Sequence, residues 1–294
     1  MYDTILVPTD GSEHAQRAAA HARQLAIAFD ADVHVLAVVD VSDAAGPFNA
    51  GGVDKAYVEQ LETRYREGVD DVETVLKPDV TVQTALRRGQ AAEEILEYAA
   101  EIDADALAMG THGRTGIKRF VAGSVTETVL RKSPVPVLTV RATERSDVTG
   151  GYDDILLPTD GSQAASVAFE HGIALATAFD ARIHAVNVVD IAALSSEEPL
   201  PSNVLDIRRD AGQKAVETVA AEARESGLEA VTAVRDGYPA SDLLEYAEAN
   251  EIDLIAMGTA GQTGLSRFLL GSTTERIVRH AEIPVLAVNA RREE

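Results

Sequence analysis

The sequence predicts an α/β protein of two tandem doubly wound (Rossmann-like) domains, each a five-stranded parallel sheet with helices on both faces. Three observations predict this class. Short apolar runs alternate with longer segments of helical spacing along the chain. Most of these apolar runs are nearly continuous, as expected for strands covered on both faces. The chain also repeats itself, so that the segment from Tyr2 returns at Tyr152.

The repeat covers most of each half of the chain. Residues 2–40 align without a gap with residues 152–190, and residues 89–140 align with residues 237–288. The intervening segments differ in sequence and, by two residues, in length. A period this long indicates duplicated domains, because solenoid repeats span roughly 20–50 residues. The expected division is a first domain over 1–142, a linker over 143–150 within the polar stretch 141–150, and a second domain over 151–294.

The elements of each copy follow from local signals. A first strand at Thr4–Val7 is expected to stop at Pro8, and Ser12 is expected to cap a helix that runs to Phe29. The further elements of the first copy are expected as strands at 33–39, 80–86, 106–109 and 135–140 and helices at 54–76, 90–101 and 124–132. Strands that alternate with helices in this way form parallel sheets with right-handed crossovers.

Composition narrows the classes of function. The formal net charge is −22, with 48 acidic against 26 basic residues, and Arg far outnumbers Lys. Such a surface keeps a protein dissolved, repels nucleic acid, and is typical of proteins from salt-accumulating cytoplasms. The absence of cysteine excludes disulfides and thiolate metal sites. No signal peptide or membrane-length apolar run is present, so we expect a soluble, cytoplasmic protein without a membrane partner.

Two segments of each copy suit a ligand site, because ligands of open α/β sheets bind beyond the carboxyl ends of strands. The first segment is Pro8-Thr9-Asp10-Gly11-Ser12, which returns as residues 158–162. The second is Met109-Gly110-Thr111-His112-Gly113, which returns as residues 257–261. Nine residues after it, each copy has Gly-Ser at the expected start of a helix.

The second segment has the chemistry of a phosphate site. Glycines let backbone N–H groups approach an anion, and a helix N-terminus adds free N–H groups and a positive dipole end. Alternatives stay open. Ser124 could cap its helix in a capping box with Glu127, as Ser272 could with Glu275. Asp10 could be a turn residue before Gly11.

These residues carry a resemblance to a known family. The pattern Gly-x-x-Gly, nine residues, Gly-Ser resembles the ATP-binding motif of the universal stress protein family, and it occurs at Gly110, Gly113, Gly123 and Ser124 and again in the second copy. The opening Ile-Leu-Val-Pro-Thr-Asp-Gly-Ser and the ending Pro-Val-Leu-Thr-Val are also similar to that family. The resemblance covers nearly the whole chain, apart from the middle segments and the linker.

The resemblance implies one ATP site per domain. Asp10 and Asp160 would lie near the ribose or a Mg²⁺ ion that is held mainly by the phosphates, and Val38 and Val188 would contact adenine through the backbone. The implied binding residues are Pro8, Thr9, Asp10, Val38, Met109, Gly110, His112, Gly113, Arg114, Gly123, Ser124, Val125 and Thr126 in the first copy, and Pro158, Thr159, Asp160, Val188, Met257, Gly258, Gly261, Gly271, Ser272, Thr273 and Thr274 in the second.

The two copies differ within this motif. His112 becomes Ala260, and Arg114 becomes Gln262. A His at a phosphate site could donate a hydrogen bond, although a lone loop His is more often incidental. The difference concerns the affinity of the second site more than its existence.

Three classes of function compete. The expected one is a regulatory, non-enzymatic ATP-binding protein in a stress response, with no catalytic residues and no metal ion held by the protein itself. A slow ATPase or phosphotransferase would need chemistry that is missing, since the sequence has no Walker motif and no kinase signature. A nucleotide-free partner-binding protein is disfavoured by the intact glycine motif.

The last strand of each copy suggests how the domains assemble. Residues 135–140 and 283–288 are strongly apolar and would be hazardous as open edges. We expect the two domains to pack through these strands as an intramolecular pseudo-dimer, as single-domain members of the resembled family dimerise. A further homodimer of the whole chain stays open.

Overall fold

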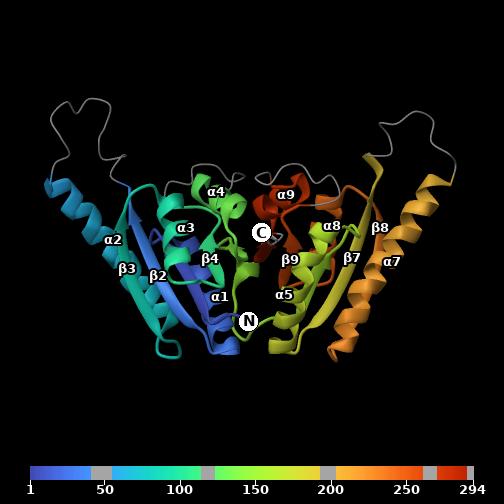
Figure 1. Cartoon of the computed structure of the whole chain (residues 1–294), viewed down its shortest axis with the longest axis horizontal. Helices are drawn as coiled ribbons and strands as arrows, with labels where there is room; N and C mark the ends of the chain where they lie inside the picture. Colours follow the sequence, from blue (N-terminus) through green and yellow to red (C-terminus); the bar gives the residue numbers. More distant parts are fainter. Residues whose placement is uncertain (41–54, 114–122, 193–202, 261–269, 290–294) are drawn as a thin grey trace. The chain divides into compact units, whose positions relative to one another are not determined.

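The computed structural model describes residues 1–40, 55–113, 123–192, 203–260 and 270–289 (Figure 1). The chain divides into two compact units, Met1–Val148 and Thr149–Glu294, called unit 1 and unit 2 below. Each unit is a parallel sheet with helices packed on it, so the predicted fold class is confirmed.

Unit 1 contains β1 (Thr4–Thr9), α1 (Glu13–Phe29), β2 (Asp32–Val39), α2 (Lys55–Leu76), β3 (Val82–Arg88), α3 (Ala91–Glu101), β4 (Ala106–Gly110), α4 (Ser124–Lys132) and β5 (Val137–Val140). Its strands lie in the order β3-β2-β1-β4-β5. Helices α1 and α2 pack against each other, and so do α3 and α4. The order runs outward from β1 to β2 and β3 on one side and continues with β4 and β5 on the other, as in doubly wound folds.

Unit 2 repeats this plan with β6 (Asp154–Pro158), α5 (Gln163–Phe179), β7 (Arg182–Asp190), α7 (Val204–Glu225), β8 (Ala230–Gly237), α8 (Pro239–Ala249), β9 (Leu254–Gly258), α9 (Ser272–His280) and β10 (Val285–Val288). Its strands lie in the order β8-β7-β6-β9-β10. The central strands are buried, whereas β3 and β8 are partly exposed along their length.

The first strand of each unit does not stop before its proline, which corrects the sequence-based boundary. β1 continues through Pro8 to Thr9, and β6 includes Pro158. In unit 2, Thr159 N donates to Val186 O of β7. Strand alternation then turns the Pro158 nitrogen toward β9, where the pairing with β6 has already ended at Leu156. A missing N–H group on that side costs no ladder bond.

The first helix of each unit begins and ends as its sequence predicts. The Ser12 hydroxyl accepts from Ala15 N at 3.2 Å, and the Ser162 hydroxyl accepts from Ala165 N at 3.1 Å. Both helices end at an Asp in the left-handed conformation, with φ 56° at Asp30 and at Asp180. Buried alanines along α1 allow the helix to lie close to the sheet.

The start of the expected linker packs on unit 1. A short 3₁₀ helix spans Glu144–Ser146, and Ser146 is buried. His21 Nε2 on α1 lies 2.9 Å from Ser146 O, and Arg17 pairs with Asp147 at 2.7 Å. Residues 143–147 are therefore tied to α1.

An ion pair joins the second helix of each unit to the end of its third strand, with opposite polarity in the two units. In unit 1, Arg88 Nε on β3 donates to Glu62 Oε1 on α2 at 2.7 Å. In unit 2, Arg209 Nε on α7 donates to Asp236 on β8 at 3.1 Å. The basic residue thus belongs to the strand in unit 1 and to the helix in unit 2.

No helix among the described segments is long and apolar enough to cross a membrane.

Candidate functional site

The first and fourth strands of each unit are paired over only a short stretch, at the point where the strand order reverses. In unit 1 the β1–β4 pairing covers only Ile5 and Leu6 opposite Ala106 and Leu107. In unit 2 the β6–β9 pairing is equally short. Beyond these residues the strands separate toward their carboxyl ends, which is where open α/β sheets bind ligands.

Unit 2 contains a pocket of about 360 Å³ at these strand ends. Every described residue that the sequence assigned to the second site lines this pocket. These residues are Pro158, Thr159, Asp160, Val188, Met257, Gly258, Gly271, Ser272, Thr273 and Thr274. Gly261 lies outside the described residues. Two segments about 100 residues apart in the sequence therefore form one cavity.

The segment after the first strand is a tight turn. Asp160 Oδ1 accepts from Ser162 N at 2.9 Å, and Thr159 Oγ1 accepts from Gly161 N at 3.1 Å. Gly161 has φ 77°, which favours glycine. Asp10 makes the same bond to Ser12 N at 3.0 Å, so the turn role expected as an alternative is confirmed.

Asp10 also faces the glycine segment. A Cβ added to Gly113 would lie 2.7 Å from Asp10 Oδ2. One carboxylate oxygen of Asp10 therefore shapes the turn while the other lies beside the glycine loop, where a cation or a hydroxyl group could meet it.

The glycine that ends the fourth strand is needed for packing. A Cβ on Gly110 would lie 2.7 Å from the His14 Cβ, and a Cβ on Gly258 would overlap the Ala164 carbonyl oxygen. The first turn of α1 or α5 thus presses directly against the strand end. This close approach leaves no room for a side chain at either position and is a reason for these glycines that is independent of any phosphate.

The helix after the glycine segment has no side-chain cap. Gly271 is the N-cap of α9 and Gly123 is the N-cap of α4, with no side-chain cap bond at either. Ser272 and Ser124 are the first helical residues, so the capping-box alternative is wrong. Helix geometry leaves the first N–H groups without an intrahelical acceptor. Because Ser272, Thr273 and Thr274 line the pocket, these N–H groups are placed where they could donate to an anion.

The threonine in this turn fixes the helix to the strand. Thr274 Oγ1 donates to Gly258 O at 2.9 Å, and Thr126 Oγ1 donates to Gly110 O at 2.8 Å. Gly271 N and Gly123 N each donate to a threonine carbonyl of the loop at 2.8 Å. The hydroxyl hydrogens of Thr126 and Thr274 are therefore used within the fold.

Unit 1 places its predicted residues on the corresponding elements. Pro8 and Thr9 end β1, Asp10 follows it, Val38 lies on β2, Met109 and Gly110 end β4, His112 and Gly113 follow β4, and Gly123, Ser124, Val125 and Thr126 begin α4. Arg114 lies outside the described residues.

Sequence reasoning missed His14 in unit 1. The His14 and His112 rings lie 5.3 Å apart, and Ala142 N donates to His14 Nδ1 at 2.8 Å. Burial lowers the pKa of His14, and the nearby Arg141 charge lowers it further. Unit 2 has Ala164 and Ala260 at these positions. Comparison of residues 14 and 164 in the gap-free alignment could have shown this second difference.

The unit 2 pocket also has walls that the motif did not indicate. Asn187 on β7 lines it, together with Arg208 and Gly212 on α7. Helix α7 lies in the segment that is not repeated between the copies, so motif comparison gave no signal for Arg208 and Gly212. Position 187 was visible as a difference, since the first copy has Ala37 there.

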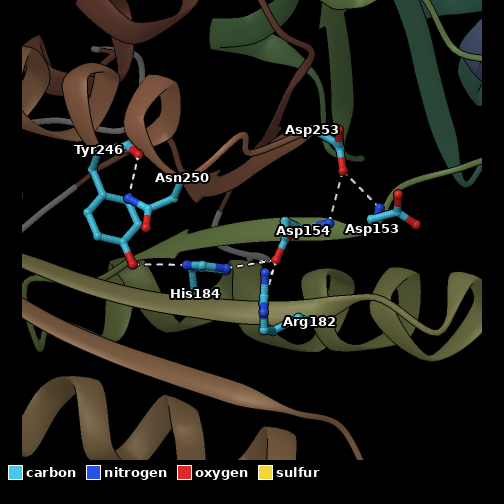
Figure 2. Close-up of polar contacts among 7 residues, drawn as sticks. All are labelled: Asp153, Asp154, Arg182, His184, Tyr246, Asn250 and Asp253. Carbon is cyan, nitrogen blue, oxygen red and sulfur yellow. Dashed lines mark hydrogen bonds and ion pairs between the residues drawn. The ribbon is translucent and has the colours of Figure 1, made fainter.

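A second polar cluster lies at the amino ends of the unit 2 strands (Figure 2). His184 Nδ1 is 2.9 Å from the Tyr246 hydroxyl, and its Nε2 is 2.8 Å from Asp154 Oδ1, which also accepts from Arg182 at 2.7 Å. Burial raises the pKa of Asp154, but the hydrogen bonds from Arg182 and His184 outweigh it and hold that pKa below its usual value. Asp253 accepts from the backbone of Asp153 and Asp154. These residues do not line the pocket.

The doubly wound domain is present twice, and a glycine-bounded pocket lies at the strand ends of unit 2, which together define a tandem α/β protein with a candidate ligand pocket. The model of the universal stress protein family matches residues 1–141 and 151–289. The chain therefore belongs to the universal stress protein family.

Its relatives agree with this assignment. A universal stress protein of Methanocaldococcus jannaschii is 38% identical over 148 residues, which cover 49% of this chain and 85% of that protein. One of Mycolicibacterium smegmatis is 27% identical and aligns with 98% of this chain and 97% of its own length. The crystal structure of a universal stress protein from Archaeoglobus fulgidus shares the fold, with a TM-score of 0.71, 21% identity, and coverage of 99% of this chain and 98% of that one.

Proposed function

We propose that this protein binds ATP, one molecule in each unit, and acts as a regulatory stress-response protein rather than as an enzyme. The observation that carries the proposal is the pocket of unit 2, in which a strand-end turn, a glycine segment and an uncapped helix N-terminus line one cavity. Its volume of about 360 Å³ falls within the range of small-molecule and cofactor pockets.

The residues present suit a nucleotide triphosphate with Mg²⁺. The N–H groups at the start of α9 would hold the phosphates, and Asp160 would lie near the ribose or the ion. Among the described residues, no group of three or more His, Asp or Glu side chains could hold a metal ion. Mg²⁺ would therefore be bound mainly through the phosphates, since this ion often keeps few protein ligands.

Calorimetry of the full chain with Mg-ATP tests the proposal, and the expected stoichiometry is about two per chain. Ser272→Asp is the sharpest variant. A carboxylate in the first turn of α9 interacts favourably with the helix dipole, so unit 2 should stay folded. The same carboxylate repels phosphate, so unit 2 should lose its nucleotide site. Ser124→Asp is the matched variant for unit 1, and each should remove one site.

Controls make the outcomes clear. Thermal melting without nucleotide should show both variants folded, and product analysis after long incubation should show ATP intact. A stoichiometry of zero for the unaltered chain in high salt contradicts ATP binding. Release of ADP at a rate lost in the Ser124→Asp/Ser272→Asp double variant contradicts the non-enzymatic role.

We also propose that the protein is cytoplasmic and that its units pair as a pseudo-dimer through residues 135–140 and 283–288. Val137→Glu combined with Val285→Glu introduces charge on both strands. In small-angle scattering, a monomer carrying both changes should show a larger radius than the unaltered monomer. A change in oligomer size alone, with the radius of the monomer preserved, contradicts the pseudo-dimer.

A further inference from the structure

Asn187 is a buried amide in the wall of the unit 2 pocket. Its side chain is 7% exposed, and its Nδ2 donates to Thr159 O at 2.7 Å. Only the amide nitrogen can pair with a carbonyl oxygen, so this bond fixes which way the amide faces. Oδ1 therefore points away from Thr159.

Helix α7 leaves room for this oxygen. A Cβ on Gly212 would overlap Asn187 Oδ1, and both residues line the pocket. Among the described residues, Oδ1 accepts no hydrogen bond. Oδ1 is not among the buried side-chain atoms that lack a partner, so it is open to the pocket, where a ligand or a water molecule can donate to it. Unit 1 has Ala37 at this position and so lacks the acceptor.

The strand order places Asn187 away from the N-terminus of α9. Helix α9 follows β9, whereas Asn187 lies on β7, and β6 lies between these two strands. A nucleotide with its phosphates at α9 would extend across β6 and bring its nucleoside end toward β7. In that orientation the acceptor would face the part of the ligand that distinguishes one nucleotide from another.

We propose that Asn187 is a specificity-determining residue of unit 2, and that its Oδ1 accepts a hydrogen bond from a donor on the nucleoside end of the ligand. This inference rests on the proposed ATP binding. The donor is the exocyclic amino group of adenine or the ribose 2′-hydroxyl, which share this chemistry. Unit 2 then selects such ligands more strictly than unit 1 does.

A double-mutant cycle on the full chain tests the contact. Ser124→Asp suppresses the unit 1 site, and Asn187→Ala is added in that background. Calorimetry compares ATP, the 6-deamino analogue purine riboside triphosphate, and 2′-deoxy-ATP. We expect one analogue to bind about three- to tenfold more weakly than ATP when Asn187 is present, and that difference to vanish in the Asn187→Ala variant. Which analogue responds identifies the donor.

Gly212→Ala provides an independent route that leaves Asn187 in the chain. The added methyl group would displace Oδ1, so the preference should shrink in the same way. Equal weakening of all three ligands by Asn187→Ala shows a purely structural role and overturns the inference, as does ATP binding that the change leaves untouched. Failure of the unaltered chain to bind ATP at all overturns the proposed function and the inference with it.

Discussion

His21 shows how one buried side chain can set the pH response of a unit. It lies on α1 with its Nε2 against Ser146 O. Burial lowers its pKa to about 4, while the hydrogen bond to Ser146 opposes the shift. The folded unit thus keeps this imidazole neutral in a range where an unfolded chain, with an ordinary pKa of about 6.5, would bind a proton.

This difference predicts a loss of stability in mild acid. The His21 contribution is fully present above pH 6.5 and falls as the pH drops toward 4, by about 3 kcal/mol in the free energy of unfolding, at about 1.36 kcal/mol for each pH unit between the two pKa values. His21→Gln keeps a donor for Ser146 without titrating in this range. Urea unfolding between pH 7 and pH 4.5 should show a flatter profile for this variant.

The control for this experiment is His171→Gln, the same change at the corresponding position of unit 2. If His21→Gln leaves the slope of the unfolding free energy against pH unchanged, the explanation from burial is wrong.

At the residue scale, most of the residues predicted from the sequence repeat in both copies, whereas the ones that were missed differ between the copies or lie outside the repeat. Asp160 and Gly258 were found because both copies retain them. Asn187 was missed because its role depends on contacts with Gly212 and Thr159, which the sequence alone does not reveal. His14 was missed because a polar residue in the first turn of a helix is usually solvated.

Among the elements, α1 and α4 begin in different ways, and this difference can be measured. Ser12 caps α1, whereas α4 begins at Ser124 after an uncapped Gly123. Ser12→Ala should lower the free energy of unfolding by about 1 kcal/mol, because it removes the acceptor for Ala15 N.

Ser124→Ala is the matched comparison and should change stability little, because its hydroxyl caps nothing. Thermal and denaturant unfolding of the two variants gives the comparison directly. An equal loss of stability in both would contradict the assignment of the helix starts.

Element boundaries show where local signals suffice. The predicted α4 range is confirmed because a Gly and a basic last turn bound it. The predicted end of the first strand was wrong because a proline costs a ladder hydrogen bond only if its nitrogen faces a paired neighbouring strand. The capping-box alternative was wrong because the pattern Ser-x-x-Glu also occurs in a helix whose N-cap is the preceding glycine. Neither the direction of the proline nitrogen nor the cap role of the glycine can be read from the neighbouring residues in the sequence.

For the whole molecule, the net charge of −22 predicts dependence on salt. Dense carboxylates repel one another at low ionic strength, and added salt screens that repulsion. The melting temperature should rise as KCl increases from low to molar concentration. A melting temperature that is indifferent to KCl would contradict the salt-adapted interpretation of the composition.

Because the two ion pairs have opposite polarity, the second helix of one unit cannot replace that of the other without placing like charges together. A chimera with α2 of unit 1 in place of α7 would set Glu62 against Asp236, two like charges where an attraction stood. Moving α2 together with β3 carries the Arg88 partner along. Chimeras that keep the second helix and the third strand of one unit together should therefore be modestly more stable than chimeras that separate them. Expression yield and melting temperature of the two kinds of chimera would show the difference.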